Sequence, residues 1–215
     1  MIDMAKAQGD IISAVIIIII AMGLVGAAYS WGLPLIQKRQ DTAIVNRVLN
    51  YFDQNNINSL PSLIERVANI GDKETFSLDV NGVWILKEYT EASSFNNSLT
   101  FSFSSKVSNL ATGQWISLTT GASCPPSNAT LGVHKSSVVC ARADSTAGGY
   151  NITYMVLFRE LDDSSGTKGY KIDLQNGGAS LTSTGKGVRV SRGEISSKSV
   201  GQLTLIETII KVIFE

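Results

Sequence analysis

The sequence has little of the chemistry on which enzymes depend. Its 215 residues include one histidine and two cysteines, and charged residues make up 17% of the chain, against roughly 25% in an average soluble domain. Basic and acidic side chains balance at 18 each, so the net charge gives no attraction to nucleic acid. No nucleophile elbow, zinc-binding histidine pair, phosphate-binding loop or dinucleotide fingerprint is present. We therefore expect a protein that is not an enzyme, uses no cofactor or metal and does not bind nucleic acid.

The isolated residues that suggest chemistry each have a simpler structural explanation. The single histidine, His134, stands in a polar stretch beside Lys135 and is expected to be a solvated loop residue. Asp162 and Asp163 lack the spacing of an EF-hand calcium loop, so we expect a hairpin turn there. Strand tryptophans more often fill cores than bind sugars, which is our expectation for Trp84 and Trp115.

A run without any charged side chain extends over residues 11–37. As a helix, residues 11–36 would measure about 39 Å, which exceeds the roughly 30 Å of a bilayer's hydrocarbon core. The part from Val15 to Met22 is apolar on every side, whereas a core helix of a soluble protein usually has a polar face. Tyr29 and Trp31 lie near its downstream end, where interfacial aromatic residues are enriched. The run predicts a membrane-spanning helix, with a very hydrophobic core helix as the alternative.

The helical pattern continues beyond Pro34, where a kink is expected because proline removes a backbone donor. Apolar residues recur there with the period of an amphipathic helix. They are Ile44, Val45, Val48, Leu49 and Phe52. We expect this stalk helix to end within residues 55–58. A short second helix is predicted over residues 62–68, with Ser62 and Glu65 as a capping box or Ser59 as an alternative cap.

From residue 74 onward the sequence has the alternation and turn residues of β-strands. Strands are predicted at residues 75–78, 83–86, 99–103, 115–118, 150–158, 169–174, 187–190 and 203–214. Asn81-Gly82 is a hairpin signal between the first two, and the polar turn at residues 162–166 is expected to pair strand 150–158 with strand 169–174. The fold class expected is α+β: a long N-terminal transmembrane and stalk helix, then a mainly antiparallel, β-sandwich-like domain.

The two cysteines, Cys124 and Cys140, both fall in the β-rich part. Their surroundings contain no paired-cysteine motif, which argues against zinc. The alternatives are a disulfide, which we favour, and two unpaired thiols. A disulfide would place this part of the chain outside the cytoplasm.

Three Asn-x-Ser/Thr triplets begin at Asn96, Asn128 and Asn151. A chain rich in Asn, Ser and Thr produces such triplets by chance, but here they accompany a cysteine pair downstream of one membrane helix. We therefore expect possible N-glycosylation at these residues and an extracellular location from about residue 40 onward.

The residues before the apolar run read Lys6-Ala7-Gln8-Gly9. A charged residue and small residues directly before a hydrophobic helix resemble the class III signal peptides of type IV pilins and archaeal pilin-like proteins. The resemblance implies cleavage by a prepilin peptidase between Ala7 and Gln8, with a cut between Gly9 and Asp10 as the second choice. The apolar helix then survives in the mature protein.

That resemblance implies three parts: a polar leader at residues 1–9, a membrane helix and stalk at 10–57, and an extracellular β-rich domain with a short leading helix at 58–215. In the family, apolar helices leave the membrane and pack together as the core of a surface filament, so a homo-oligomer formed through the N-terminal helix is expected. Gly23, Gly26, Ala27 and Ala28 would allow close helix approach. The alternative is a permanently membrane-anchored β-domain protein, such as a stator-like accessory of the archaeal motility filament, a receptor or an adhesion module.

Overall fold

The computed structural model describes residues 2–89, 94–201 and 203–215, and it describes the side chains of the first helix from residue 13 onward. The chain divides into two compact units, Met1–Thr42 and Ala43–Glu215. Helix α1 (Ile2–Phe52) provides the whole of the first unit and the start of the second, and its helical backbone continues through Pro34. The predicted stalk residues 43–52 are therefore part of the second, β-rich unit.

Helix α1 ends at Phe52, a few residues before the predicted end. Polar side chains account for the earlier stop, because they compete for the backbone groups that another helical turn would use. Asp53 accepts a hydrogen bond from the backbone nitrogen of Asn55 at 2.9 Å, and the side-chain amide of Asn56 donates to the carbonyl oxygen of Asn50 at 3.1 Å.

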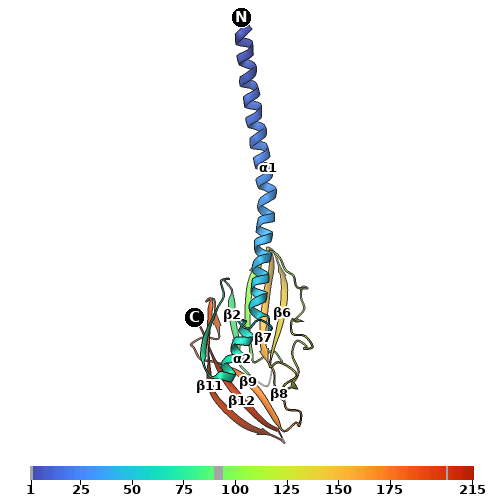
Figure 1. Cartoon of the computed structure of the whole chain (residues 1–215), viewed down its shortest axis with the longest axis vertical. Helices are drawn as coiled ribbons and strands as arrows, with labels where there is room; N and C mark the ends of the chain where they lie inside the picture. Colours follow the sequence, from blue (N-terminus) through green and yellow to red (C-terminus); the bar gives the residue numbers. More distant parts are fainter. Residues whose placement is uncertain (1, 90–93, 202) are drawn as a thin grey trace. The chain divides into compact units, whose positions relative to one another are not determined.

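Helix α2 (Leu60–Ile70) is longer than predicted and has Ser59 as its N-cap. The capping box of Ser62 and Glu65 is therefore wrong. Proline stands in the first turn, where its missing N–H has no intrahelical partner to lose. Gly71 is the C-cap of the helix, and its left-handed φ of 89° lets its backbone nitrogen donate to the carbonyl oxygen of Val67. Helix α2 packs against β1 (Lys73–Ser77), β11 (Gly187–Val200) and β12 (Leu203–Phe214). Figure 1 shows it beside β11 and β12.

In the described part of the chain the strands form two six-stranded sheets. The first has the order β1-β11-β12-β9-β8-β5. Its strands are β1 (Lys73–Ser77), β11 (Gly187–Val200), β12 (Leu203–Phe214), β9 (Lys168–Asn176), β8 (Leu161–Asp162) and β5 (Ala129–Thr130). The second has the order β10-β2-β3-β7-β6-β4. Its strands are β10 (Thr182–Ser183), β2 (Val83–Lys87), β3 (Ser98–Ser105), β7 (Gly149–Phe158), β6 (Ser137–Thr146) and β4 (Ile116–Ser117). Among the strands of the described residues only the pairs β12–β9 and β5–β8 are parallel, so the unit is mostly antiparallel, as predicted.

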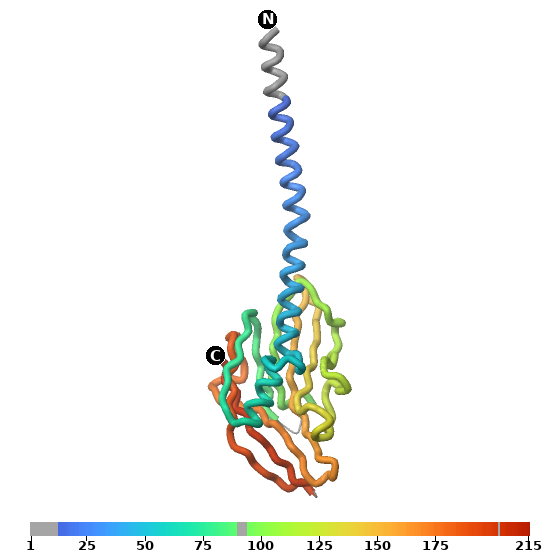
Figure 2. The backbone as a smooth tube through the Cα atoms, viewed as in Figure 1, coloured from blue at the N-terminus to red at the C-terminus, as the bar shows by residue number. Residues whose placement is uncertain are grey.

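Two predicted pairings are wrong. Strands β1 and β2 flank Asn81-Gly82 but lie in different sheets, because β1 pairs with β11 and β2 with β3. Strands β7 and β9 are likewise in different sheets, and the turn at residues 162–166 instead joins β8 to β9. Strand β6 was not predicted, and β11 extends ten residues beyond the predicted Val190. Figure 2 shows β11 and β12 as the long red hairpin at the C-terminal end of the chain.

Buried residues from both helices and both sheets form one hydrophobic core. Val45, Val48 and Phe52, all on the predicted apolar stripe of α1, are buried. The ring of Phe52 stacks on that of Tyr154 at 5.1 Å between centroids and lies 6.4 Å from that of Trp84. The end of α1 is thus held by aromatic side chains of β2 and β7.

Candidate functional site

The first candidate site is the apolar surface of α1. The helix from Ser13 is long and apolar enough to span a membrane, and its most apolar stretch is not buried. Exposed large side chains follow one another along it, from Val15 at 50% to Trp31 at 82% exposure. One face forms a shallow apolar surface whose members are Ile18, Ala21, Met22, Val25, Gly26 and Tyr29. These positions recur at the spacing of a single helix face, so one side of α1 is available to lipid or to another helix.

The predicted small residues of this helix leave its surface open. A β-carbon placed on Gly23 or Gly26 would meet nothing within 4 Å. Within one chain neither glycine is needed to avoid a clash. The residues at the two predicted cleavage positions, Ala7, Gln8, Gly9 and Asp10, lie outside the residues whose side chains the structure describes.

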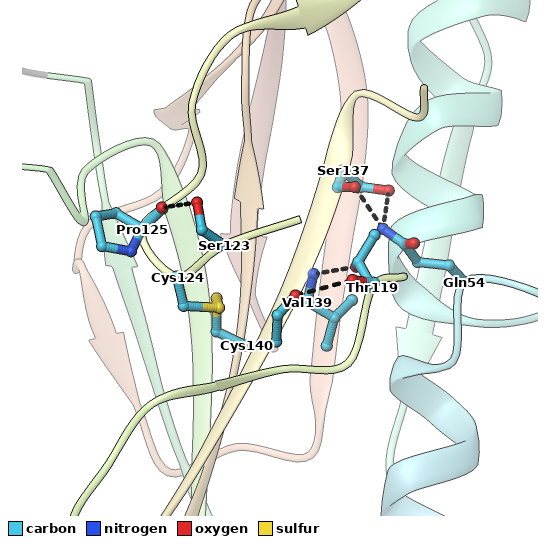
Figure 3. The surroundings of a disulfide bond; sticks show 9 residues. Gln54, Thr119, Ser123, Cys124, Pro125, Ser137, Val139 and Cys140 are labelled. Atoms are coloured by element: carbon cyan, nitrogen blue, oxygen red, sulfur yellow. Dashed lines mark hydrogen bonds between the residues drawn. A yellow bond between two sulfur atoms is a disulfide. The ribbon is translucent and has the colours of Figure 1, made fainter. Parts of the chain in front are cut away.

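The cysteines predicted to pair are joined in a disulfide, with 6.1 Å between the Cα atoms of Cys124 and Cys140 (Figure 3). Cys140 is fully buried in β6. The backbone nitrogen of Val139, next to Cys140, donates a hydrogen bond to Thr119 Oγ1, in the loop after β4, at 2.9 Å. The side chain of Gln54 donates to the hydroxyl of Ser137 at 3.0 Å. The disulfide therefore attaches the loop that contains Cys124 to strand β6. Through Ser137, β6 also contacts Gln54 in the segment after α1.

The three predicted glycosylation acceptors occupy different environments. Asn128 is exposed, in the loop that the disulfide closes and directly before β5. Asn96 is partly buried and lines the same polar pocket as Asn128. Asn151 lies within β7, paired with Ser104 of β3 and Asp144 of β6. Exposure thus favours Asn128 as an acceptor.

The other residues singled out from the sequence have structural roles. The Nδ1 atom of His134 accepts a bond from the backbone nitrogen of Thr130 at 3.3 Å. Asp163 accepts bonds within the β8–β9 turn, and the hydroxyl of Ser165 is the main cause that lowers its pKa to about 2. Trp84 is fully buried in the core. Among the described residues no three His, Cys, Asp or Glu side chains are placed to hold a metal ion.

The sequence reasoning missed a partly buried group of charges on β9 and β12. Lys171 and Glu207 lie opposite each other in the parallel pair and are 8% and 7% exposed. The ammonium of Lys171 lies 2.9 Å from the ring centroid of Tyr89, and that of Lys198 lies 2.6 Å from Glu207 Oε2. Burial lowers the pKa of Lys171 and raises that of Asp173. The available signal was the alternation of charged and apolar residues in β9, with Lys171 and Asp173 on either side of Ile172.

A polar pocket adjoins this group. It is lined by Arg159, Glu160 and Lys171 together with the amides of Asn96 and Asn128. Arg159 is 8% exposed and donates from Nε to the carbonyl oxygen of Lys135 at 3.1 Å. Burial, followed by the nearby charge of Asp162, raises the pKa of Glu160. The described lining mixes both signs of charge, and among its described residues no nucleophile stands beside a base, so it gives no basis for assigning a reaction.

Comparisons of the chain with protein-family models, with curated proteins and with solved structures return no match.

Proposed function

We propose that the protein is a structural, non-enzymatic subunit of an archaeal type IV pilus-like surface filament, assembled through its N-terminal helix. The observation that carries the proposal is the contrast between the two units. The β-rich unit buries a core of its own, while the helix from Val15 to Ile36 leaves its apolar side chains exposed. Such a helix needs a covering, first from lipid in the membrane and then, in the filament, from neighbouring copies.

Further parts of the proposal follow from the same arrangement. A prepilin peptidase removes the leader after Ala7, and the disulfide-bearing unit faces the outside of the cell, with Asn128 as its best placed glycan acceptor. The two sheets form a β-sandwich-like head, which is supported by the core that residues of both sheets share. No cofactor or nucleic acid takes part.

The direct test is to isolate surface appendages and to identify this chain and its N-terminal peptide in them by mass spectrometry. The proposal expects the chain in purified filaments with Gln8, or in second place Asp10, as its first residue. An intact amino terminus on surface-exposed protein would refute the processing step, and filaments without this chain would refute the assembly.

A substitution in α1 separates assembly from membrane insertion. Gly26→Ile keeps the helix apolar, and a β-carbon at this position meets nothing within 4 Å in a single chain, so an assembly defect is attributed to neighbouring copies. We expect Gly26→Ile to remain in the membrane and to be lost from filaments. The volume-conserving control Ile19→Leu keeps both properties. Normal filaments from the Gly26→Ile variant would contradict helix packing at this face.

The second candidate function is a permanently membrane-anchored extracellular β-domain. Tyr29 and Trp31 favour it, because they are 69% and 82% exposed and aromatic residues of this kind settle at membrane interfaces. If the protein is permanently anchored, all of it stays in the membrane fraction, and Gly26→Ile does not change the amount found there.

A further inference from the structure

Strand β11 has an open edge in its second half. It pairs with β12 as far as Val200, but β1 covers its other side only from Gly187 to Ser191. Among the described residues no strand pairs with that side from Ile195 to Val200. β1 is the outer strand of the sheet on this side, and its pairing with β11 ends at Ser191. Unpaired backbone groups along such an edge are a template for another strand.

The usual protections of an edge strand are weak here. A register shift, or bulge, lies between Arg192 and Ile195, but the pairing with β12 then continues without interruption to Val200. Lys198 is the only charged residue from Ile195 to Val200; it forms an ion pair with Glu207 of the same chain, but its side chain is 63% exposed and stays open to a second acidic partner. Ile195 and Val200 are 56% and 57% exposed. The edge is regular, accessible and partly apolar.

We propose that a second copy of this chain adds its own β11 edge to this one, antiparallel and related by a two-fold axis at Ser196. The charge pattern selects this register. It places Glu194 opposite Lys198 of the second copy, and the symmetry repeats that pair on the other side of the axis. Centring the pair on Glu194 or on Lys198 instead would oppose two like charges.

The alternation of side chains between the two faces of β11 is consistent with this register. Ser196 pairs with Glu207 and Ile195 with Thr208, so Ser196 and Lys198 share one face while Ile195 lies on the other. Glu194 is exposed and is the last residue of the bulge; alternation from Ile195 puts it on the face of Ser196 and Lys198. The two copies of Ile195 then lie diagonally across the axis and cover each other's exposed surface.

A two-fold contact closes on itself and does not propagate along a helical filament. If the chain is a filament subunit, the β11 edges therefore join subunits of two neighbouring filaments, which bundles them. If the chain stays anchored in the membrane, the same edges make a dimer. The inference goes beyond the proposed function and does not depend on the assembly of α1.

Cysteine cross-linking of the full chain in detergent tests the register. In the proposed pair the two Ser196 Cα atoms face each other at about 4.5 to 5.5 Å, within the range for a disulfide. Ser196→Cys should therefore give a covalent dimer under mild oxidation. Ser197→Cys is the matched control: Ser197 is the more exposed residue, but its counterpart across the axis is Ile195, so it should cross-link at least ten-fold less.

A charge reversal in the Ser196→Cys background completes the test. Glu194→Lys opposes Lys198 of the second copy and should reduce the cross-linked fraction several-fold, while Glu194→Gln should reduce it less. Equal cross-linking at positions 196 and 197, or no dimer from a folded Ser196→Cys protein, would overturn the inference. Because the readout is a bond at β11, it is independent of whether filaments form.

Discussion

Asn97 joins the two sheets, and its replacement should destabilise the β-rich unit strongly. Its side-chain amide donates to the carbonyl oxygen of Phe158 in β7 at 3.0 Å and to that of Ile172 in β9 at 2.7 Å. Its side-chain oxygen accepts from the backbone nitrogen of Leu174 at 2.8 Å. Asn97 is 1% exposed and has a φ of 51°, a left-handed conformation that asparagine tolerates better than most residues.

The expected loss follows from these contacts. Asn97→Ala removes three hydrogen bonds, each worth about 1 kcal/mol net, and leaves buried backbone groups without that partner, which adds to the loss. Alanine in the left-handed region costs about 1 kcal/mol more. Together these effects should lower the free energy of unfolding by about 4 kcal/mol. Asn97→Gly removes the same bonds but avoids the backbone strain, so it should lose about 1 kcal/mol less than Asn97→Ala.

Urea unfolding of the full chain in mild detergent measures this, with the fluorescence of the fully buried Trp84 as the signal. Asn96→Ala is the matched control. It changes the neighbouring amide, which is only partly buried, and should shift the unfolding free energy by less than about 1 kcal/mol. A loss below 1 kcal/mol for Asn97→Ala, or a larger loss for Asn97→Gly than for Asn97→Ala, would refute this account of Asn97.

Five more substitutions test the core, the charges and the disulfide in the same unfolding assay. Phe52→Ala should lose about 4 kcal/mol because it empties a fully buried aromatic site, whereas Ile57→Ala, at 73% exposure, should lose little. The hydroxyl of Tyr154 is buried without a hydrogen-bond partner among the described residues, and burial raises its pKa to about 12; the wild type should therefore lose stability as the pH rises from 10 toward 12, and Tyr154→Phe should lose less. Burial raises the pKa of Glu160 above its ordinary value, which penalises the folded state as the pH rises above about 4.5; Glu160→Gln should be more stable than the wild type at pH 7 and no more stable at pH 4. Cys124→Ala opens a loop with a sequence separation of 16 and should lose about 3 kcal/mol, and a reducing agent should destabilise the wild type but not this variant.

The parts of the fold that local patterns control could be predicted from the sequence. The run of apolar residues marks the exposed part of α1, and the apolar stripe identified Val45, Val48 and Phe52 as the side that packs in the core. The β-branched C-terminal run is strand β12 within the predicted bounds. These features depend on residues a few positions apart.

Strand partners could not be predicted, because they depend on contacts between distant segments. Asn81-Gly82 has hairpin chemistry, yet the backbone nitrogen of Leu78 donates to the carbonyl oxygen of Lys186, more than a hundred residues away. Gly82 serves packing instead, since a β-carbon there would lie 2.4 Å from the ring of Phe101. Likewise, nothing around Asn97 distinguishes it from Asn96, and its role depends on β7 and β9 meeting there.

The exposed surface of α1 sets the conditions for the proposed function. Of the 24 large apolar side chains that are exposed in the described part of the chain, 14 lie between Val15 and Ile36. Burying such a side chain fully is worth about 1.5 to 3 kcal/mol, so covering the half still exposed on each of the 14 amounts to roughly 10 to 20 kcal/mol. That is as large as the stability of a typical domain, and the helix therefore needs a covering.

Lipid and a neighbouring helix are similarly apolar coverings, so exchanging one for the other gains little hydrophobic free energy. Close fit and contacts outside the membrane must then decide between a filament and an anchored protein. The open surface at Gly23 and Gly26 allows close fit, whereas the two-fold contact at the edge of β11 joins completed filaments and does not decide whether one forms. Gly26→Ile acts on helix fit and Glu194→Lys on the edge contact. If both contributions matter and are independent, the two substitutions should alter different steps: the first should prevent filaments, and the second should leave filaments intact but unbundled.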